Sequence, residues 1–190
     1  MKNTKIDAVL FDYDGVLMDS MEDNFKAWQN TFSKYGKKIQ RNDYMQLEGM
    51  SPKDIVRNIC GKYGIEIKYL SNIISNKEKF YRINNNTEPY RGVSKLLRKL
   101  KRKGLKLALV SGALEERIRS VSSSTFLSLF DVIVTADIVA NSKPHPEPYQ
   151  KALEFLRISP RRALVVENAP LGIESARAAG IYCIAICTTL

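Results

Sequence analysis

Five short apolar segments recur along the chain and predict the strands of a sheet. They cover residues 7–11, 105–110, 132–135, 163–166 and 182–187. A short, continuously apolar run is the pattern of a strand that is buried on both faces. Helical patterns precede two of these segments, at residues 93–103 and 172–179, and a glycine that can cap a helix follows each pattern. Strands that alternate with helices predict an α/β fold with a parallel sheet and right-handed crossovers.

Residues 20–88 interrupt this alternation, because they show several helical patterns and no convincing strand. Phe25, Trp28 and Phe32 recur at helical spacing, so we expect them to form the core of this insertion. Its end, residues 84–89, is polar and rich in turn formers, as a hinge would be. The predicted domains are therefore an all-helical insertion at residues 19–88 and a sheet domain made of residues 1–18 and 89–190.

The composition fits one good core with a small satellite core, since 44% of the 190 residues are hydrophobic. The longest apolar run near the N-terminus is four residues, so neither a signal peptide nor a membrane span is predicted there, and a cytoplasmic location follows as the default expectation. Cys60, Cys183 and Cys187 are too few and too scattered for a disulfide framework. We expect all three to be reduced, with Cys183 and Cys187 buried as small hydrophobes.

The formal charge of +10 allows nucleic acid, anionic membranes or small anionic substrates as partners. The densest basic run, residues 91–106, spaces its charges around one apolar stripe, which is the pattern of a solvated helix face. No sequence signature of a nucleic-acid module is present either. We therefore expect neither nucleic acid nor a membrane as partner, whereas a basic surface would still attract small phosphorylated substrates.

Polar residues follow four of the predicted strands, and the carboxyl ends of parallel strands share one edge of the sheet. In chain order these residues are Asp12 and Asp14, then Ser111 and Gly112, then Lys143, and then Glu167 and Asn168. Two aspartates at a strand end can act as turn formers, but their mutual repulsion also calls for a cation. Hard oxygen ligands favour Mg²⁺. Lys143 could be a solvated loop lysine, or it could bind a phosphoryl group together with the hydroxyl and backbone amide of Ser111.

These residues stand in four motifs that resemble those of the haloacid dehalogenase-like phosphatases. In order, the motifs lie at residues 12–20, 110–112, 142–149 and 165–180. The resemblance covers nearly the whole chain and implies a Rossmann-like core, with residues 19–88 as a mobile helical cap over the site.

The resemblance also implies a role for each residue. Asp12 would be the nucleophile that accepts the phosphoryl group, and Asp14 the acid and base. Ser111, Gly112 and Lys143 would bind the phosphoryl oxygens. The Mg²⁺ ligands would be Asp12, the backbone carbonyl of Asp14, Glu167 and Asn168, some of them through water.

The chain departs from the family pattern in three places. Asn168 stands where a second acid is usual, which predicts weaker metal affinity. The sugar-phosphate mutase branch would have a histidine at Asn24 and an arginine at Pro52, so their loss favours hydrolysis over isomerisation. The chain also stops soon after the fifth strand, where family members usually continue, and an uncovered sheet edge could promote weak association.

Three functions follow as hypotheses. The first is a Mg²⁺-dependent phosphatase of a small phosphorylated metabolite, a sugar phosphate or a compound like phosphoglycolate, acting as a monomer or weak dimer. The second is a sugar-phosphate mutase of the beta-phosphoglucomutase type. The third is a weakly active phosphate-binding regulatory protein.

Overall fold

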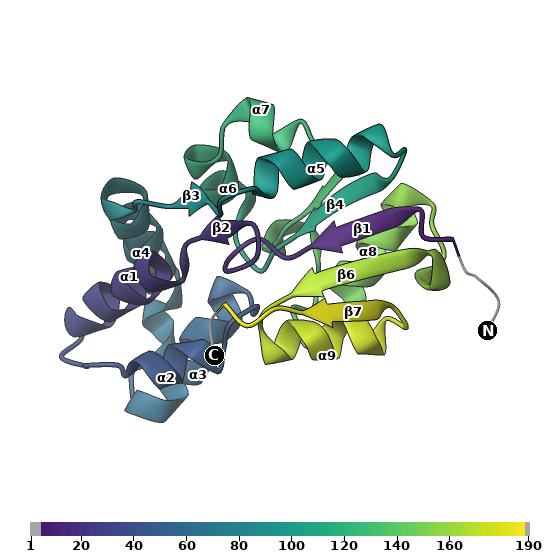
Figure 1. The fold of residues 1–190 in the computed structure, drawn as a ribbon. Coiled ribbons are helices and arrows are strands. Elements are labelled where there is room, and N and C mark those ends of the chain that lie inside the picture. The colour runs from purple at the N-terminus through teal and green to yellow at the C-terminus, as the bar shows by residue number, and fades with distance from the viewer. Residues whose placement is uncertain (1–4, 189–190) are drawn as a thin grey trace.

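The computed structural model describes residues 5–188 and contains a five-stranded parallel sheet with the order β5-β4-β1-β6-β7 (Figure 1). The strands are β1 (Ala8–Phe11), β4 (Lys106–Val110), β5 (Val132–Val134), β6 (Ala163–Glu167) and β7 (Tyr182–Ala185). Each lies within two residues of its predicted bounds. The predicted α/β fold class is confirmed.

Helices cover both faces of this sheet (Figure 1). On one face lie α5 (Val93–Arg102), α6 (Glu115–Val121) and α7 (Ser124–Leu127), and on the other α8 (Glu147–Leu156) and α9 (Pro170–Ala178). Two 3₁₀ turns, η2 (Ala136–Ile138) and η3 (Pro160–Arg162), complete this part. Val9 and Phe11 of β1 pack toward the first face, and Ala8 and Leu10 toward the second. This double coverage explains why β1 is continuously apolar.

The cap segment, residues 19–88, packs around its own apolar core. It contains α1 (Met21–Ser33), α2 (Arg41–Met45), α3 (Pro52–Tyr63), η1 (Ile67–Tyr69) and α4 (Leu70–Asn84). Phe25, Trp28 and Phe32 are buried in this core together with Ile55 and Ile59, as their spacing predicted. The insertion thus stabilises itself by burying apolar area, in addition to any contact with the sheet.

The chain passes between the sheet and the cap segment at two points, and these two connections lie side by side. β2 (Met18–Asp19) pairs antiparallel with β3 (Glu88–Pro89), although the sequence analysis found no strand in this region. Two-residue strands carry no detectable periodicity, which is why the pattern did not reveal them. The pairing places residues 18–19 beside residues 88–89, at the end of the segment predicted as a hinge. The domain boundaries themselves stay a prediction.

The prediction for the fifth strand is wrong in one respect, because this strand is not buried. Among residues 5–188, β7 is the edge strand of the sheet and pairs with β6, so Tyr182 is 74% exposed and Cys187 beyond it is also exposed. The same edge position leaves Cys183 half-buried, whereas Cys60 is buried in the cap core. Apolar composition predicted the strand correctly, but its burial depends on which elements lie beside it.

The helices of residues 5–188 include none that is long and apolar enough to cross a lipid bilayer.

Candidate active site

Lys143 joins the carboxyl ends of three strands at one buried point. Its Nζ donates to Asp12 Oδ1 at 2.5 Å, to Glu167 Oε1 at 2.7 Å and to the carbonyl oxygen of Val110 at 3.2 Å. The lysine side chain is 1% exposed. The alternative of a solvated loop lysine is therefore wrong, and the predicted convergence of Asp12, Lys143 and Glu167 is present in the structure.

Burial and neighbouring charges have opposite effects on the pKa values of Lys143 and Asp12. Burial lowers the pKa of Lys143, but the two carboxylates beside it outweigh that effect and raise the pKa, so the lysine is charged. Burial raises the pKa of Asp12 to about 8 despite Lys143, and the charge of Glu167 adds to the rise. Asp12 therefore needs more positive charge than Lys143 provides if it is to be an ionised nucleophile at neutral pH.

Glu167 is held from several sides. Its Oε2 accepts the backbone N–H groups of Asn168 and Ala169 at 2.8 and 2.9 Å, and its Oε1 accepts the Tyr149 hydroxyl at 3.1 Å. Gly172, in the first turn of α9, makes room for this carboxylate, because a Cβ at that position would overlap its atoms. The start of α9 therefore both orients Glu167 and requires a glycine.

Gly172→Ala is expected to destabilise the protein by about 1–3 kcal/mol, because the added methyl group has to displace Glu167 or the helix. Urea unfolding followed by circular dichroism measures the change. The matched control is Gly61→Ala in α3, where a Cβ would meet no described heavy atom within 4 Å. That control should stabilise the protein by up to about 1 kcal/mol through helix propensity. Equal effects of the two substitutions would contradict the close contact at Gly172.

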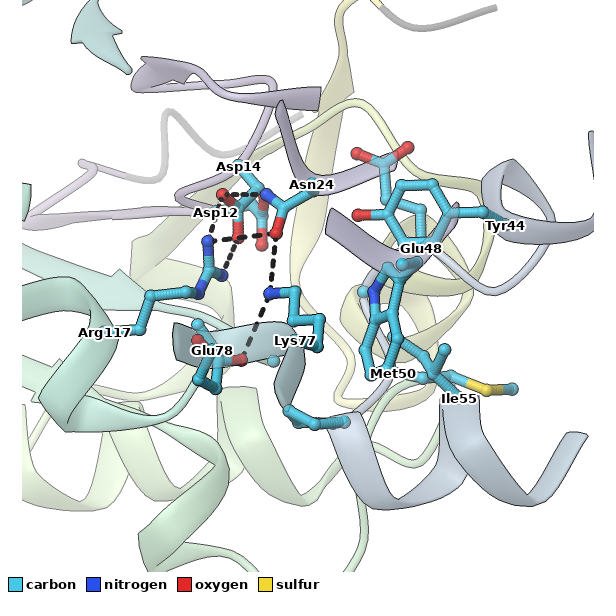
Figure 2. A pocket seen from close by; sticks show the side chains of 15 residues that line it. Asp12, Asp14, Asn24, Tyr44, Glu48, Met50, Ile55, Lys77, Glu78 and Arg117 are labelled. Carbon is cyan, nitrogen blue, oxygen red and sulfur yellow. Dashed lines mark hydrogen bonds and ion pairs between the residues drawn. The ribbon is translucent and has the colours of Figure 1, made fainter. Parts of the chain in front are cut away.

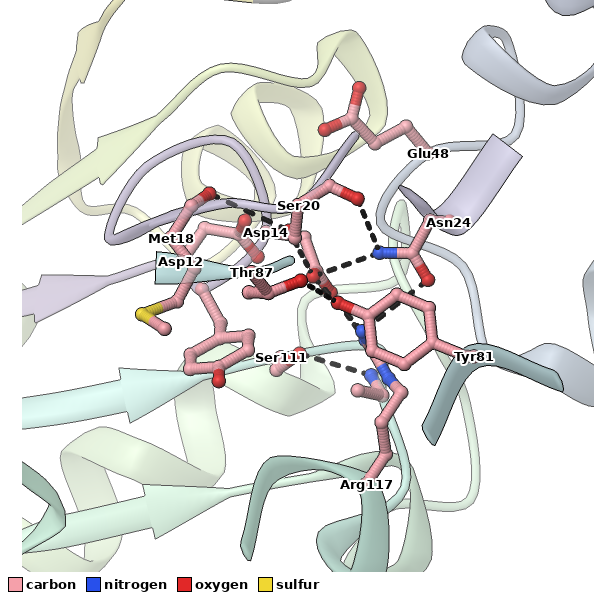
Figure 3. A network of polar contacts seen from close by, with 12 residues as sticks. Asp12, Asp14, Met18, Ser20, Asn24, Glu48, Tyr81, Thr87, Ser111 and Arg117 are labelled. Atoms are coloured by element: carbon pink, nitrogen blue, oxygen red, sulfur yellow. Dashed lines mark hydrogen bonds and ion pairs between the residues drawn. The ribbon is translucent and has the colours of Figure 1, made fainter. Parts of the chain in front are cut away.

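Asp14 belongs to a second polar network, which the sequence analysis did not foresee (Figure 3). Both terminal nitrogens of Arg117 on α6 donate to its carboxylate, as do Ser20 Oγ at 2.5 Å and Asn24 Nδ2 at 3.0 Å. Arg117 is itself buried, 7% exposed. Burial raises the pKa of Asp14, but the charge and hydrogen bonds of Arg117 together with the Ser20 hydroxyl hold that pKa below its ordinary value. Asp14 is therefore ionised in this arrangement.

Arg117→Met is expected to cost about 3 kcal/mol of stability at pH 7, because it leaves the ionised Asp14 buried without its partner. A lowered carboxyl pKa contributes stability above the unfolded pKa, 3.8 for Asp14, and that contribution is lost as pH falls through the folded value. In the variant, burial raises the pKa of Asp14 with no arginine to oppose it, so the deficit should shrink as pH falls from 7 to 3.5 in urea titrations. Arg119→Met, on the exposed side of the same helix, is the control. A deficit that is independent of pH would contradict the ion pair.

The loop after β4 carries the predicted phosphate-binding residues. The Ser111 amide donates to the Val134 carbonyl at 2.9 Å, so this N–H is part of the sheet, contrary to its predicted role at a phosphate oxygen. Its hydroxyl accepts the Ala113 N–H at 3.0 Å and keeps its own proton to donate. Gly112 lies against the cap segment, because a Cβ there would come within 2.5 Å of the Gly49 carbonyl oxygen.

A cavity of about 30 Å³ separates the cap segment from the sheet (Figure 2). Asp12 and Asp14 line it from the sheet side, and Tyr44, Glu48 and Lys77 line it from the cap side. Such a volume holds about one water molecule. The cap is therefore closed over the candidate site.

Lys77 and Arg117 are the buried cations that the sequence analysis missed. Lys77 Nζ donates to Asn24 Oδ1 at 2.9 Å and to Glu78 Oε1 at 3.1 Å. A usable signal existed for both: Lys77 stands midway between Ile73 and Tyr81 at the four-residue spacing of a buried helical stripe, and Arg117 precedes the buried Ile118. A charged residue on an apolar stripe is informative, because such residues are rarely buried without a partner.

Glu48 connects the cap segment to the end of β6. Its Oε1 accepts Asn168 Nδ2 at 2.6 Å, and the glutamate is 4% exposed. Burial raises the pKa of Glu48 to about 9, and the charge of Asp12 adds to this rise. Sequence periodicity offered no hint of this contact, since 120 positions separate the two residues.

Comparison with known proteins identifies the family. Residues 9–186 match the family model described as haloacid dehalogenase-like hydrolase. The chain belongs to this family. It is 32% identical over 190 residues to the pyrophosphatase PpaX of Bacillus cereus (strain B4264), and the match covers 98% of the chain and 85% of that protein.

Two further similarities to known proteins bear on length and fold. The chain is 31% identical over 195 residues to the chloroplastic protein SUPPRESSOR OF QUENCHING 1 of Arabidopsis thaliana, but it spans 18% of that protein's length. A solved structure from Bacteroides vulgatus, provisionally assigned as a beta-phosphoglucomutase, aligns with a TM-score of 0.87 and 32% identity, covering 98% of this chain and 78% of that one. The family resemblance of the four motifs is thus confirmed.

The site of this haloacid dehalogenase-like chain fits a hard divalent cation. The predicted ligands are oxygen atoms: the Asp12 and Glu167 carboxylates, the Asp14 backbone carbonyl and the Asn168 amide oxygen, some of them through water. Among residues 5–188, no three His, Cys, Asp or Glu side chains form a compact cluster for a metal. Mg²⁺ keeps several waters and uses few carboxylates, so backbone and amide oxygens suit it. The rise in the pKa of Asp12 on burial is the observation that favours a cation here.

Proposed function

We propose that this chain is a Mg²⁺-dependent phosphatase that hydrolyses a small phosphorylated metabolite through an aspartyl-phosphate on Asp12. The observation that carries the proposal is the buried bridge from Lys143 to Asp12 and Glu167 at the carboxyl edge of the sheet. It sets a nucleophilic carboxylate beside a positive charge that can bind a phosphoryl oxygen. The relative PpaX is named as a pyrophosphatase, which supports a phosphorylated substrate.

The proposed reaction has two steps. Asp12 attacks phosphorus through a carboxylate oxygen, the bond from phosphorus to the leaving oxygen breaks, and Asp14 gives that oxygen a proton. Water then attacks the phosphorus of the aspartyl-phosphate, Asp14 accepts the proton of that water, and phosphate leaves with Asp12 regenerated. Because Arg117 keeps Asp14 ionised in this structure, Asp14 has to leave Arg117 and take up a proton before the first step.

The remaining residues bind and orient. Lys143 and the Ser111 hydroxyl would hold phosphoryl oxygens, and Gly112 would let the chain approach them closely. When bound, Mg²⁺ supplies positive charge to the phosphoryl group and to the nucleophile, and it would be held by Asp12, the Asp14 carbonyl and Asn168. Both oxygens of Glu167 already accept protein hydrogen bonds, which favours contact with the ion through water.

Substrate entry requires the cap segment to move, since a phosphorylated metabolite does not fit a cavity of about 30 Å³. We propose the β2–β3 pair as the hinge, because it contains both connections between residues 19–88 and the sheet. Closure then excludes bulk water and brings Lys77 and Asn24 to the substrate.

A screen of metabolite phosphates and a generic aryl phosphate, with Mg²⁺ or with a chelator, tests the proposal. Phosphate release that depends on Mg²⁺ is the expected result. Phosphate binding without turnover on any substrate would contradict it.

The alternative is a sugar-phosphate mutase, which the Bacteroides vulgatus structure favours. Asn24 hydrogen-bonds Asp14 and Pro52 lines the cavity, so two positions that would carry a histidine and an arginine in a mutase face the site without them. Hydrolysis of a sugar 1-phosphate that is faster than its isomerisation, with a bisphosphate primer present, supports the phosphatase. The reverse order would establish the mutase.

A further inference from the structure

Asn168 lowers the negative charge of the proposed cation site, because an acid is usual at this position of the fourth motif. The structure shows what the amide does instead. Asn168 is 6% exposed at the end of β6, and its Nδ2 donates to Glu48 Oε1 at 2.6 Å. An aspartate in its place would bring two carboxylates to hydrogen-bond distance, where they repel. Asn168 and Glu48 are therefore complementary.

Glu48 comes from the cap segment, in the turn after α2, and it reaches the cavity from the same side as Tyr44 (Figure 2). The residues that follow Glu48 pack closely against the carboxyl edge of the sheet. A Cβ on Gly112 would lie 2.5 Å from the Gly49 carbonyl oxygen and 2.6 Å from that of Met50, and a Cβ on Gly49 would lie 3.2 Å from Lys143 Cδ. The place of Glu48 beside Asn168 is thus a property of the closed cap.

An amide whose N–H is donated to a carboxylate is polarised, so that its carbonyl oxygen becomes a stronger ligand for a cation. The same hydrogen bond holds the amide in one orientation. In addition, a cation bound at Asn168 favours the ionised form of Glu48, whose negative charge then replaces the one that asparagine removed and acts at short range inside a buried site.

We propose that Glu48 is a positioning residue of the cation site: it orients and polarises Asn168 and supplies, from the cap, the carboxylate that the sheet domain lacks. The cation site is then complete only when the cap is closed, so that closure and cation binding strengthen each other. This inference rests on the Mg²⁺-dependent function proposed above.

Mn²⁺ binding to the whole chain without substrate, followed by electron paramagnetic resonance, tests this role independently of turnover. Glu48→Gln is expected to weaken Mn²⁺ binding about 10- to 100-fold, the range for losing a partner of a metal ligand. In the combined variant Glu48→Gln with Asn168→Asp, the amide at position 48 donates the hydrogen bond and the carboxylate at position 168 accepts it. The carboxylate thereby returns to the sheet domain. It is expected to recover most of the lost affinity.

Glu78→Gln is the matched control, because Glu78 is a cap carboxylate on the same cavity that pairs with Lys77. It should leave Mn²⁺ affinity nearly unchanged. Glu48→Gln that binds Mn²⁺ as tightly as the parent would overturn the inference, and so would a combined variant that stays as weak as Glu48→Gln. In both cases the Mg²⁺-dependent turnover of the parent would stand. A parent that binds no Mn²⁺ would overturn the inference and the proposed metal dependence together.

Discussion

Asp12→Asn is expected to lower phosphate release at least about 10⁴-fold, because it removes the atom that forms the covalent intermediate. An amide is a very poor nucleophile, and Glu167 is not free to take the place of Asp12, since it is tied to Lys143 and to the start of α9. The near-isosteric change leaves the packing at the end of β1 in place. Folding should therefore persist while turnover is lost.

The measurement is phosphate release under single-turnover conditions, with rapid acid quench and mass spectrometry to detect a phosphorylated peptide that contains Asp12. The parent should show the phosphorylated peptide and the variant should not. Asp19→Asn is the matched control, because Asp19 lies in the same segment but is exposed. A phosphorylated peptide elsewhere in the chain, or an Asp12→Asn variant with near-parental turnover, would refute the assignment of the nucleophile.

Lys143→Met is expected to cost about 3–5 kcal/mol of stability at pH 7, the largest structural effect that we foresee. Methionine fills a similar volume, so the loss is electrostatic: Asp12 and Glu167 stay buried without the ammonium group that bridges them. A surface lysine would give no such result. Lys99→Met, on the exposed side of α5, should change stability by less than about 0.5 kcal/mol.

The pH dependence of this variant gives a second test. Burial already raises the pKa of Asp12 above its unfolded value of 3.8, to about 8, and removal of Lys143 raises it further. A carboxyl whose folded pKa is raised loses stability as pH rises above the unfolded value, because the folded state holds a proton that the unfolded state releases. Asp12 is protonated in both folded proteins below about pH 8, so urea titrations with a chelator present should show a deficit that is nearly constant from pH 5 to pH 7 and grows above about pH 8, where only the parent's Asp12 ionises. The opposite trend would contradict the bridge.

The regular parts of this protein follow closely from sequence. Every strand of this sheet was predicted within two residues, because each is a short, mostly apolar run and such runs are easy to detect. The meeting of Asp12, Lys143 and Glu167 was also predicted, because parallel strands end at the same edge. The burial of β7 was predicted wrongly, since local composition does not say that a strand lies at the edge of the sheet.

The sequence by itself therefore determined the fold class, the separate helical insertion and the residues at the carboxyl edge of the sheet. Only the tertiary structure decided how the insertion completes that edge. The pairs Arg117 with Asp14 and Glu48 with Asn168 join residues about a hundred positions apart. Each pair depends on how one element docks on another, and docking leaves no periodic trace in either segment. Charges that are paired across such contacts can be buried, and the pattern of a single helix or turn does not show where the partner lies.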